Sequence, residues 1–292
     1  MNNYEKLEGM VAATFTPLDE NGDVNLSVID KYADWIASTP IKGVFVCGTT
    51  GEFSSLTIDE RKLILEKWLV SARKRFKVIA HVGSNCQRSA MELARHAAQV
   101  GADAIASIAP SFFKPGTVDE LVDFFAPICH SAAGLPFYYY NMPSITGVNL
   151  PVDKFLVEGK KKIPNLVGTK FTHNNLMEMG VCIELEQHRF EVLHGYDEIL
   201  ISGLAMGAVA GVGSTYNYIP NVYQAIFDSM KMNDLETARH NQIKSIRTVE
   251  VIIKYGGGVR GGKAIMKLIG IRVSPEVFST RNIIMGLLAV SF

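Results

Sequence analysis

Short apolar runs alternate with longer amphipathic runs along most of the chain. The short runs are rich in Val, Ile, Phe and Tyr, and most of them end near Gly or Pro. They span Met10–Thr16, Gly43–Cys47, Val78–Val82, Ala104–Ala109, Pro136–Tyr140, Leu166–Lys170, Phe190–His194 and Ala210–Ser214. Because these runs are continuously apolar rather than alternating, they predict strands buried on both faces of a parallel sheet.

The longer runs between them have the spacing of amphipathic helices. Ile58–Arg75 places apolar residues among charged ones at helical intervals, and Ser89–Val100 and Val118–Ser131 repeat the pattern. Strands that alternate with helices indicate βαβ units. Eight such units favour a closed (β/α)₈ barrel, the TIM barrel, over an open doubly wound sheet.

Beyond about residue 219 the pattern is helical only. The expected helices are Val222–Met232, Leu235–Tyr255, Lys263–Ile269 and a short final segment. We interpret the first as the eighth barrel helix and the others as a C-terminal helical extension. The division is therefore a barrel over residues 1–232 and an extension over 233–292 that packs on it as one structural unit.

The net charge and the composition argue against nucleic acids and membranes as binding partners. Lys+Arg and Asp+Glu both number 29, so a formal charge of zero gives no reason to expect nucleic acid or an anionic membrane. No apolar stretch reaches about 18 residues and no secretory signal opens the chain. The four cysteines are widely spaced, as in reduced proteins. We expect a cytoplasmic protein with a small-molecule substrate.

Polar residues follow five of the expected strands. They lie in Gly48–Glu52, Tyr140–Pro143, Lys170–Thr172, Gly195–Glu198 and Gly213–Asn217. The active site of a parallel barrel lies at the C-terminal ends of its strands. Hydroxyls, one lysine, one tyrosine and several glycines are therefore expected to converge there.

Lys170 ends a strand that is otherwise apolar or small. Desolvation at that place would lower the pKa of the amine, and a neutral amine is the nucleophile that a carbonyl substrate needs. The alternative is a lysine that extends to solvent from the strand end. Tyr140 has a similar pair of interpretations, an acid–base group or core packing, whereas Tyr138 and Tyr139 are interpreted as core.

Two further segments carry open alternatives. Thr49 and Thr50, with the backbone N–H groups between Gly48 and Gly51, suit a carboxylate or phosphate oxygen, or form a tight loop with a capping threonine. Asp197 and Glu198 suit a general-base pair or the N-terminus of the next helix.

Two apparent signals are rejected. Gly257–Lys263 reads G-x-x-x-x-G-K, but Ala264 stands where a phosphate loop needs Ser or Thr, and a helical run precedes it instead of a strand. The seven histidines form no H-E-x-x-H and no close pair, so no metal site is expected.

Together the strand-end motifs resemble the dihydrodipicolinate synthase / N-acetylneuraminate lyase superfamily, from about Leu7 to about residue 270. The resemblance implies that Lys170 forms the Schiff base, that Tyr140 relays protons, and that Thr49 and Thr50 bind the pyruvate carboxylate. For the proton that leaves the substrate hydroxyl, we expect Tyr140 or the substrate carboxylate as the base, with Thr50 as the relay. It also implies ligands for a sugar chain. These are Thr172, Gly195, Asp197, Glu198 and Ser214, with Gly213 shaping the loop.

Within the superfamily the lyases are favoured. Ile145 stands where the synthases of the lysine pathway carry an arginine for a substrate carboxylate, and an apolar side chain cannot replace a guanidinium. The resemblance then implies a class I aldolase that reversibly cleaves N-acetylneuraminate (sialic acid) to pyruvate and N-acetylmannosamine. It implies no cofactor beyond the covalent imine on Lys170, no metal, and a homotetramer.

Two alternatives and two departures accompany this interpretation. The alternatives are an aldolase or dehydratase of the same superfamily acting on another 2-keto acid, and a non-catalytic barrel that binds a 2-keto acid. The segment Pro110–Phe113 lacks the tyrosine that some members send to a neighbouring subunit. Residues 274–292 match the family poorly.

Overall fold

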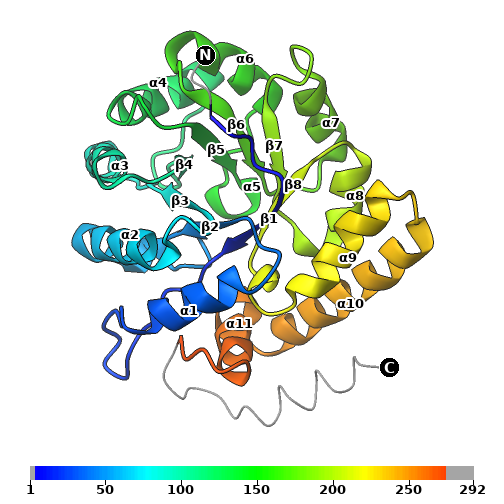
Figure 1. Cartoon of the computed structure of the whole chain (residues 1–292). Coiled ribbons are helices and arrows are strands. Elements are labelled where there is room, and N and C mark those ends of the chain that lie inside the picture. The colour runs from blue at the N-terminus through cyan, green and yellow to red at the C-terminus, as the bar shows by residue number, and fades with distance from the viewer. Residues whose placement is uncertain (1–3, 274–292) are drawn as a thin grey trace.

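Eight parallel strands close into a barrel in the order β1 to β8, which confirms the predicted (β/α)₈ architecture (Figure 1). The structure is a computed structural model that describes residues 4–273. The strands are β1 Gly9–Ala13, β2 Gly43–Val46, β3 Lys77–His81, β4 Ala104–Ile108, β5 Phe137–Asn141, β6 Leu166–Phe171, β7 Glu191–His194 and β8 Ala210–Gly213. The divergent segment 274–292, with the final helix expected there, lies outside the described residues.

Helices follow the strands and surround the barrel (Figure 1). They are α1 Val28–Ala37, α2 Ile58–Ala72, α3 Gln87–Val100, α4 Val118–His130, α5 Pro143–Thr146, α6 Val152–Lys162, α7 Leu176–Glu184, α8 Leu200–Ala205, α9 Pro220–Lys231, α10 Leu235–Lys254 and α11 Gly257–Leu268. Single 3₁₀ turns are η1 Phe53–Ser55, η2 Asp197–Ile199 and η3 Thr215–Asn217. Within the described part of the chain, no helix has the length and apolarity that a membrane crossing requires.

Successive side chains of each strand point to opposite faces, so two apolar layers form. In β5, Tyr138 and Tyr140 lie with the residues that fill the barrel interior, and Tyr139 packs outward against Phe125 and Phe155. Tyr138 and Tyr139 are core residues, as predicted, because both are about 1% exposed. The same alternation places Lys170, directly opposite Tyr140 in β6, at the inner face of the barrel.

The N-terminal end of the barrel is closed by a buried carboxylate. Glu191 Oε2 accepts hydrogen bonds from the Leu7 backbone N–H at 2.8 Å and from the Tyr138 hydroxyl at 3.1 Å. The chain segment before β1 is thereby tied across the bottom of the barrel. The polar residues that follow the strands lie at the opposite end of the barrel.

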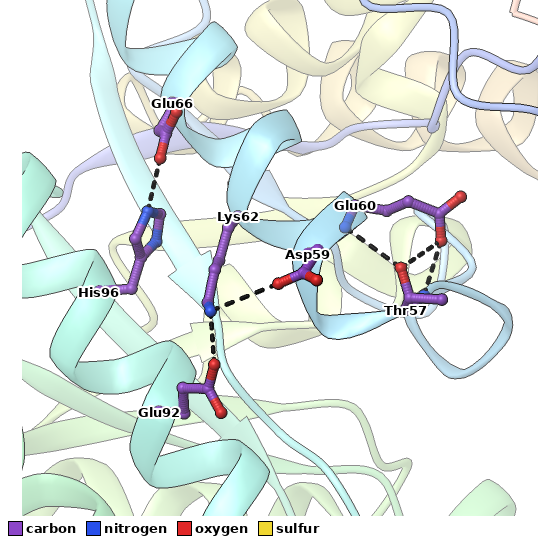
Figure 2. A network of polar contacts seen from close by, with 7 residues as sticks. All are labelled: Thr57, Asp59, Glu60, Lys62, Glu66, Glu92 and His96. Carbon is purple, nitrogen blue, oxygen red and sulfur yellow. Dashed lines mark hydrogen bonds and ion pairs between the residues drawn. The ribbon is translucent and has the colours of Figure 1, made fainter.

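Helix α2 is anchored at both its start and its exposed face (Figure 2). Thr57 and Glu60 form a capping box, with the Glu60 N–H donating to Thr57 Oγ1 at 3.2 Å and the Thr57 N–H donating to Glu60 Oε2 at 2.7 Å. Lys62 forms an ion pair with Glu92 of α3. These contacts fix the helix that directly follows the β2–α2 loop.

The C-terminal helices differ from the sequence prediction in one place. Helix α10 packs along α9, and α11 begins at Gly257 rather than at the expected Lys263 (Figure 1). Glycines lower helix propensity, so the pattern hid the first turns of α11. Gly256 and Gly257, with φ values of +99° and +84°, make the turn between the two helices. The segment that resembles a phosphate loop, Gly257–Lys263, therefore lies within α11.

Candidate active site

Lys170 lies between two aromatic rings inside the barrel. Its Nζ is 4.1 Å from the centre of the Tyr140 ring and 4.4 Å from that of the Phe45 ring. The residue is 4% exposed, so the side chain does not extend to solvent from the strand end. The geometry supports the nucleophile interpretation over the solvent-reaching alternative.

Burial lowers the pKa of Lys170 to about 7, although the Asp197 carboxylate opposes the shift. Within residues 4–273 no carboxylate lies within ion-pair distance of Nζ that could hold the proton there. A large share of the amine is therefore neutral near pH 7, which is the form that attacks a carbonyl.

The Tyr140 hydroxyl has polar contacts, unlike a purely packed aromatic residue. It lies 3.2 Å from Thr49 Oγ1 and donates to Met142 Sδ at 3.1 Å. Burial raises the pKa of the phenol to about 12. The phenol is therefore protonated at neutral pH and ready to donate a proton or a hydrogen bond beside the Lys170 amine.

The Gly48–Glu52 loop is a closed turn at the end of β2. The Glu52 N–H donates to the Thr49 carbonyl at 3.0 Å, and the Thr16 hydroxyl donates to the Gly51 carbonyl at 2.7 Å. Strand β1 ends at Ala13, three residues before the predicted Thr16. Neither threonine of the loop caps α2, because Thr57 does so. The structure thus leaves the hydroxyls of Thr49 and Thr50 for other contacts.

Thr172 and Gly195 lie against each other at the ends of β6 and β7. A Cβ at Gly195 would lie 1.9 Å from Thr172 Oγ1, so only glycine allows the threonine to occupy this place. Thr172 is 3% exposed. The predicted pair is therefore brought together by close backbone approach.

Asp197 joins the ends of β7 and β8. Its Oδ2 accepts from the Thr215 N–H at 2.8 Å and from the Thr215 hydroxyl at 2.6 Å. Burial raises the pKa of Asp197 to about 6. A Cβ at Gly213 would lie 1.8 Å from Asp197 Oδ1. The carboxylate thus holds the next loop and does not cap α8, whereas Glu198 and Ser214 lie half-buried beside it.

The sequence analysis missed two residues of the site, Phe45 and His81. The His81 ring centre is 5.9 Å from that of Tyr140 and 5.8 Å from that of Phe45. His81 Nδ1 lies 2.8 Å from the Cys47 carbonyl, and Nε2 accepts from the Ile108 N–H. Both ring nitrogens are used, and burial lowers the pKa of His81 well below its usual range, so the ring is neutral at neutral pH and packs against the site. The signal that could have indicated His81 is that it is a polar residue near the end of the otherwise apolar run Val78–Val82.

Known proteins share both the sequence and the fold. The N-acetylneuraminate lyase of Mus musculus is 42% identical over 275 residues, 93% of this chain and 86% of the relative. That of Gallus gallus is 43% identical over 279 residues, 94% and 91% of the two chains. The structure of Proteus mirabilis N-acetylneuraminate lyase superposes with a TM-score of 0.94 at 34% identity, covering 99% of this chain and 100% of that one.

A second solved structure, N-acetylneuraminate lyase (sialic acid aldolase) from Aliivibrio salmonicida, also has a TM-score of 0.94, with 35% identity over 99% of this chain and 98% of that one. The profile of the Dihydrodipicolinate synthetase family matches residues 6–279. The match spans all eight strands and every strand end described above. The chain belongs to the dihydrodipicolinate synthetase family.

Proposed function

We propose that this chain is a class I aldolase that reversibly cleaves N-acetylneuraminate to pyruvate and N-acetylmannosamine through an imine on Lys170. The observation that carries the proposal is a buried amine of pKa about 7 against the ring of a protonated phenol, Tyr140. The relatives named N-acetylneuraminate lyase, at 42–43% identity, support the choice of substrate.

The proposed reaction begins with attack of the neutral Lys170 amine on the C2 ketone of the open-chain sugar acid. Loss of water gives an iminium, which accepts the electron pair of the C3–C4 bond when that bond breaks. The C4 hydroxyl loses its proton as N-acetylmannosamine forms, and the lysine retains an enamine. Protonation at C3 and hydrolysis then release pyruvate, so the imine supplies the electron sink and no metal or organic cofactor enters.

Proton transfer is assigned to the Tyr140 hydroxyl as a relay. Because the phenol is protonated at neutral pH, it passes its own proton to the substrate carboxylate as it accepts the proton of the C4 hydroxyl. The alternative is that the substrate carboxylate takes the C4 proton directly. The hydroxyl that lies 3.2 Å from the phenol belongs to Thr49, not to Thr50. We therefore move the proposed relay from Thr50 to Thr49. Thr50 keeps its proposed place, beside Thr49, as a ligand of the pyruvate carboxylate.

The remaining strand ends are proposed to bind the polyhydroxylated chain. Their side chains and backbone groups come from the ends of β6, β7 and β8, on one side of Lys170. They are Thr172, Gly195, Asp197, Glu198 and Ser214, with Gly213 giving Asp197 its room. Ile145 of α5 is 56% exposed and offers no charge to a second substrate carboxylate, which supports a sugar rather than a dicarboxylic partner.

A substrate comparison tests the proposal. Pyruvate release is measured with N-acetylneuraminate and with 2-keto-3-deoxy sugar acids, and condensation is measured with pyruvate and aspartate semialdehyde. The highest kcat/KM is expected with N-acetylneuraminate. A higher value with another acid would reassign the substrate and leave the imine chemistry in place.

The pH profile follows from the lowered pKa of Lys170. The reactive form is the neutral amine, so activity is lost as pH falls through the folded-state pKa of about 7. Below that pH we expect kcat/KM for cleavage to fall by about tenfold per pH unit, with a plateau above it. Initial rates across this range check the prediction. A profile that is flat through pH 6 would show that Lys170 is not the titrating nucleophile.

Gly213→Ala is expected to separate the two halves of the substrate. The new Cβ would displace the Asp197 carboxylate, 1.8 Å away, whereas the pyruvate half lies against other strands. Loss of a hydrogen bond to a charged group predicts a rise of about tenfold in KM for N-acetylmannosamine. KM for pyruvate in condensation should not change. Gly134→Ala, where a Cβ meets nothing within 4 Å, is the control. Equal effects on both KM values would contradict this division.

Assembly and location are proposed on the resemblance to the family. We propose a cytoplasmic homotetramer in which residues 1–232 and 233–292 act as one unit. Two exposed aromatic residues after β4, Phe112 and Phe113, are 76% and 86% exposed in the single chain. Exposed aromatic side chains of this kind favour a protein interface. Light scattering on the purified protein measures the number of subunits.

A further inference from the structure

An ion pair between a buried lysine and a partly exposed glutamate joins the C-terminal helix α11 to the β2–α2 loop. Lys263 Nζ lies 2.5 Å from Glu52 Oε1, and the two side chains are 7% and 29% exposed. The cations of nine other ion pairs have side chains that are at least 23% exposed: Lys62, Lys67, Arg75, Lys77, Lys160, Lys161, Lys162, Arg189 and Arg247. Lys263 is therefore the exceptional case of a cation placed in the protein interior to meet one carboxylate.

The glycines of α11 explain how Lys263 reaches the loop. A Cβ at Gly262 would lie 2.4 Å from the Phe15 ring, and a Cβ at Gly261 would lie 2.9 Å from the Ile252 carbonyl. Glycine weakens a helix, so its use at both places indicates that close packing on the barrel and on α10 is required. The glycines of this segment thus allow α11 to pack closely on the barrel, which places Lys263 beside Glu52.

Glu52 is the residue that closes the loop of Thr49 and Thr50. Its backbone is left-handed, with φ of 57°, a conformation that is uncommon for residues other than glycine. Its N–H donates to the Thr49 carbonyl at 3.0 Å, and the Thr49 hydroxyl lies 3.2 Å from the Tyr140 hydroxyl. A chain of contacts therefore connects Lys263, through Glu52 and Thr49, with the Tyr140 hydroxyl beside Lys170.

We infer that Lys263 is a positioning residue that, through Glu52, holds Thr49 and Thr50 in the geometry that binds the pyruvate carboxylate. The inference rests on the proposed function, because it takes the two threonines as ligands of that carboxylate. A buried ion pair adds little net stability but restricts geometry, and removal of one partner leaves the other charge unpaired. Its loss should weaken pyruvate binding more than it slows the chemical step.

The test measures the pyruvate concentration that half-saturates borohydride-trapped adduct on Lys170, together with KM and kcat for condensation. Lys263→Met removes the charge at similar length. The half-saturating concentration and KM for pyruvate should rise about tenfold, with kcat within about twofold of wild type. Arg260→Met is the matched control, because Arg260 is an exposed cation on the same helix and its loss should change neither value.

Further variants separate positioning from general stability. Lys263→Arg keeps the charge and should restore most of the affinity for pyruvate. Glu52→Gln should reproduce the effect of Lys263→Met, and the double variant should be no worse than either single one, because both act on the same pair. If Lys263→Met does not fold, Glu52→Gln carries the test, since Glu52 is partly exposed and its shape is kept.

The outcomes are distinguishable. Unchanged half-saturation in Glu52→Gln and Lys263→Met, with normal adduct in the wild type, would overturn the inference and leave the proposed function standing. A lower melting temperature with unchanged affinity for pyruvate would also overturn it, because the pair would then act on stability alone. No adduct in the wild type would overturn the proposed function and, with it, the role of the pair.

Discussion

Lys170→Ala is expected to lower kcat for cleavage of N-acetylneuraminate by at least about 10⁴-fold, because removal of a covalent nucleophile removes the reaction path itself. The proposed path runs through an imine on this amine, and burial lowers its pKa to about 7, so about half of it is neutral near pH 7. Pyruvate release in a coupled assay, with enzyme at high concentration, measures the residual rate.

The fold of this variant should persist. Within residues 4–273, Lys170 forms no ion pair, and burial of its amine is itself unfavourable, so its removal costs packing alone. Circular dichroism and the melting temperature check this. Lys263→Met, which removes the other nearly buried lysine, is the matched control and should still form adduct at saturating pyruvate. Turnover by Lys170→Ala within tenfold of wild type would contradict the imine path.

Tyr140→Phe is expected to lower kcat by about 10²-fold or more while imine formation on Lys170 persists. Only the hydroxyl is lost, whereas the ring whose centre lies 4.1 Å from the amine remains. The variant therefore separates proton transfer from nucleophilic attack. The comparison is between kcat for cleavage and the yield of trapped pyruvate adduct.

A phenol elsewhere in the same strand gives the control. Tyr138→Phe removes a buried hydroxyl that donates to Glu191 Oε2, at the closed end of the barrel. It should reduce the free energy of unfolding by about 1 kcal/mol and leave kcat unchanged. Full activity in Tyr140→Phe, or an equal loss in Tyr138→Phe, would remove the proposed relay.

The barrel was predictable because each strand carries its own signal. A continuously apolar run such as Gly43–Cys47 is buried on both faces wherever it lies in the barrel, so local pattern is enough. The start of α11 was not predictable in this way, because four of its first six residues are glycines, which have low helix propensity. Packing against Phe15 and Ile252 decides their conformation. Phe15 lies about 250 residues before these glycines in the sequence, so a local pattern does not reveal this contact.

In the candidate site, too, some features could be predicted from the local sequence and others depend on packing between distant parts of the chain. That Lys170 lies near the end of an apolar strand is a local fact. Its burial is not, because the same pattern also fits a lysine that extends to solvent, and only the packed barrel excludes that alternative. That the Phe45 and Tyr140 rings flank the amine depends on the packing of separate strands, which sequence pattern does not give. The contact of Thr49 with Tyr140, in place of the expected Thr50, depends on the turn that Glu52 closes.

Asp197 shows how a local ambiguity is resolved by a distant partner. A carboxylate before a short helix is equally suited to a helix N-terminus and to a binding site. In the structure, the backbone N–H and the hydroxyl of Thr215, at the end of β8, both donate hydrogen bonds to Asp197 Oδ2. Gly213 has no side chain that would collide with Oδ1. Both contacts depend on how the ends of β7 and β8 lie next to each other, so the sequence alone could not assign them.

The most direct measurement is mass spectrometry of the wild-type protein after incubation with pyruvate and borohydride. The proposal predicts one added mass of a reduced pyruvyl group, mapped to the peptide that contains Lys170. An adduct on another lysine, or none on a folded protein that still binds pyruvate, would contradict it and indicate a barrel that binds a 2-keto acid without the imine chemistry.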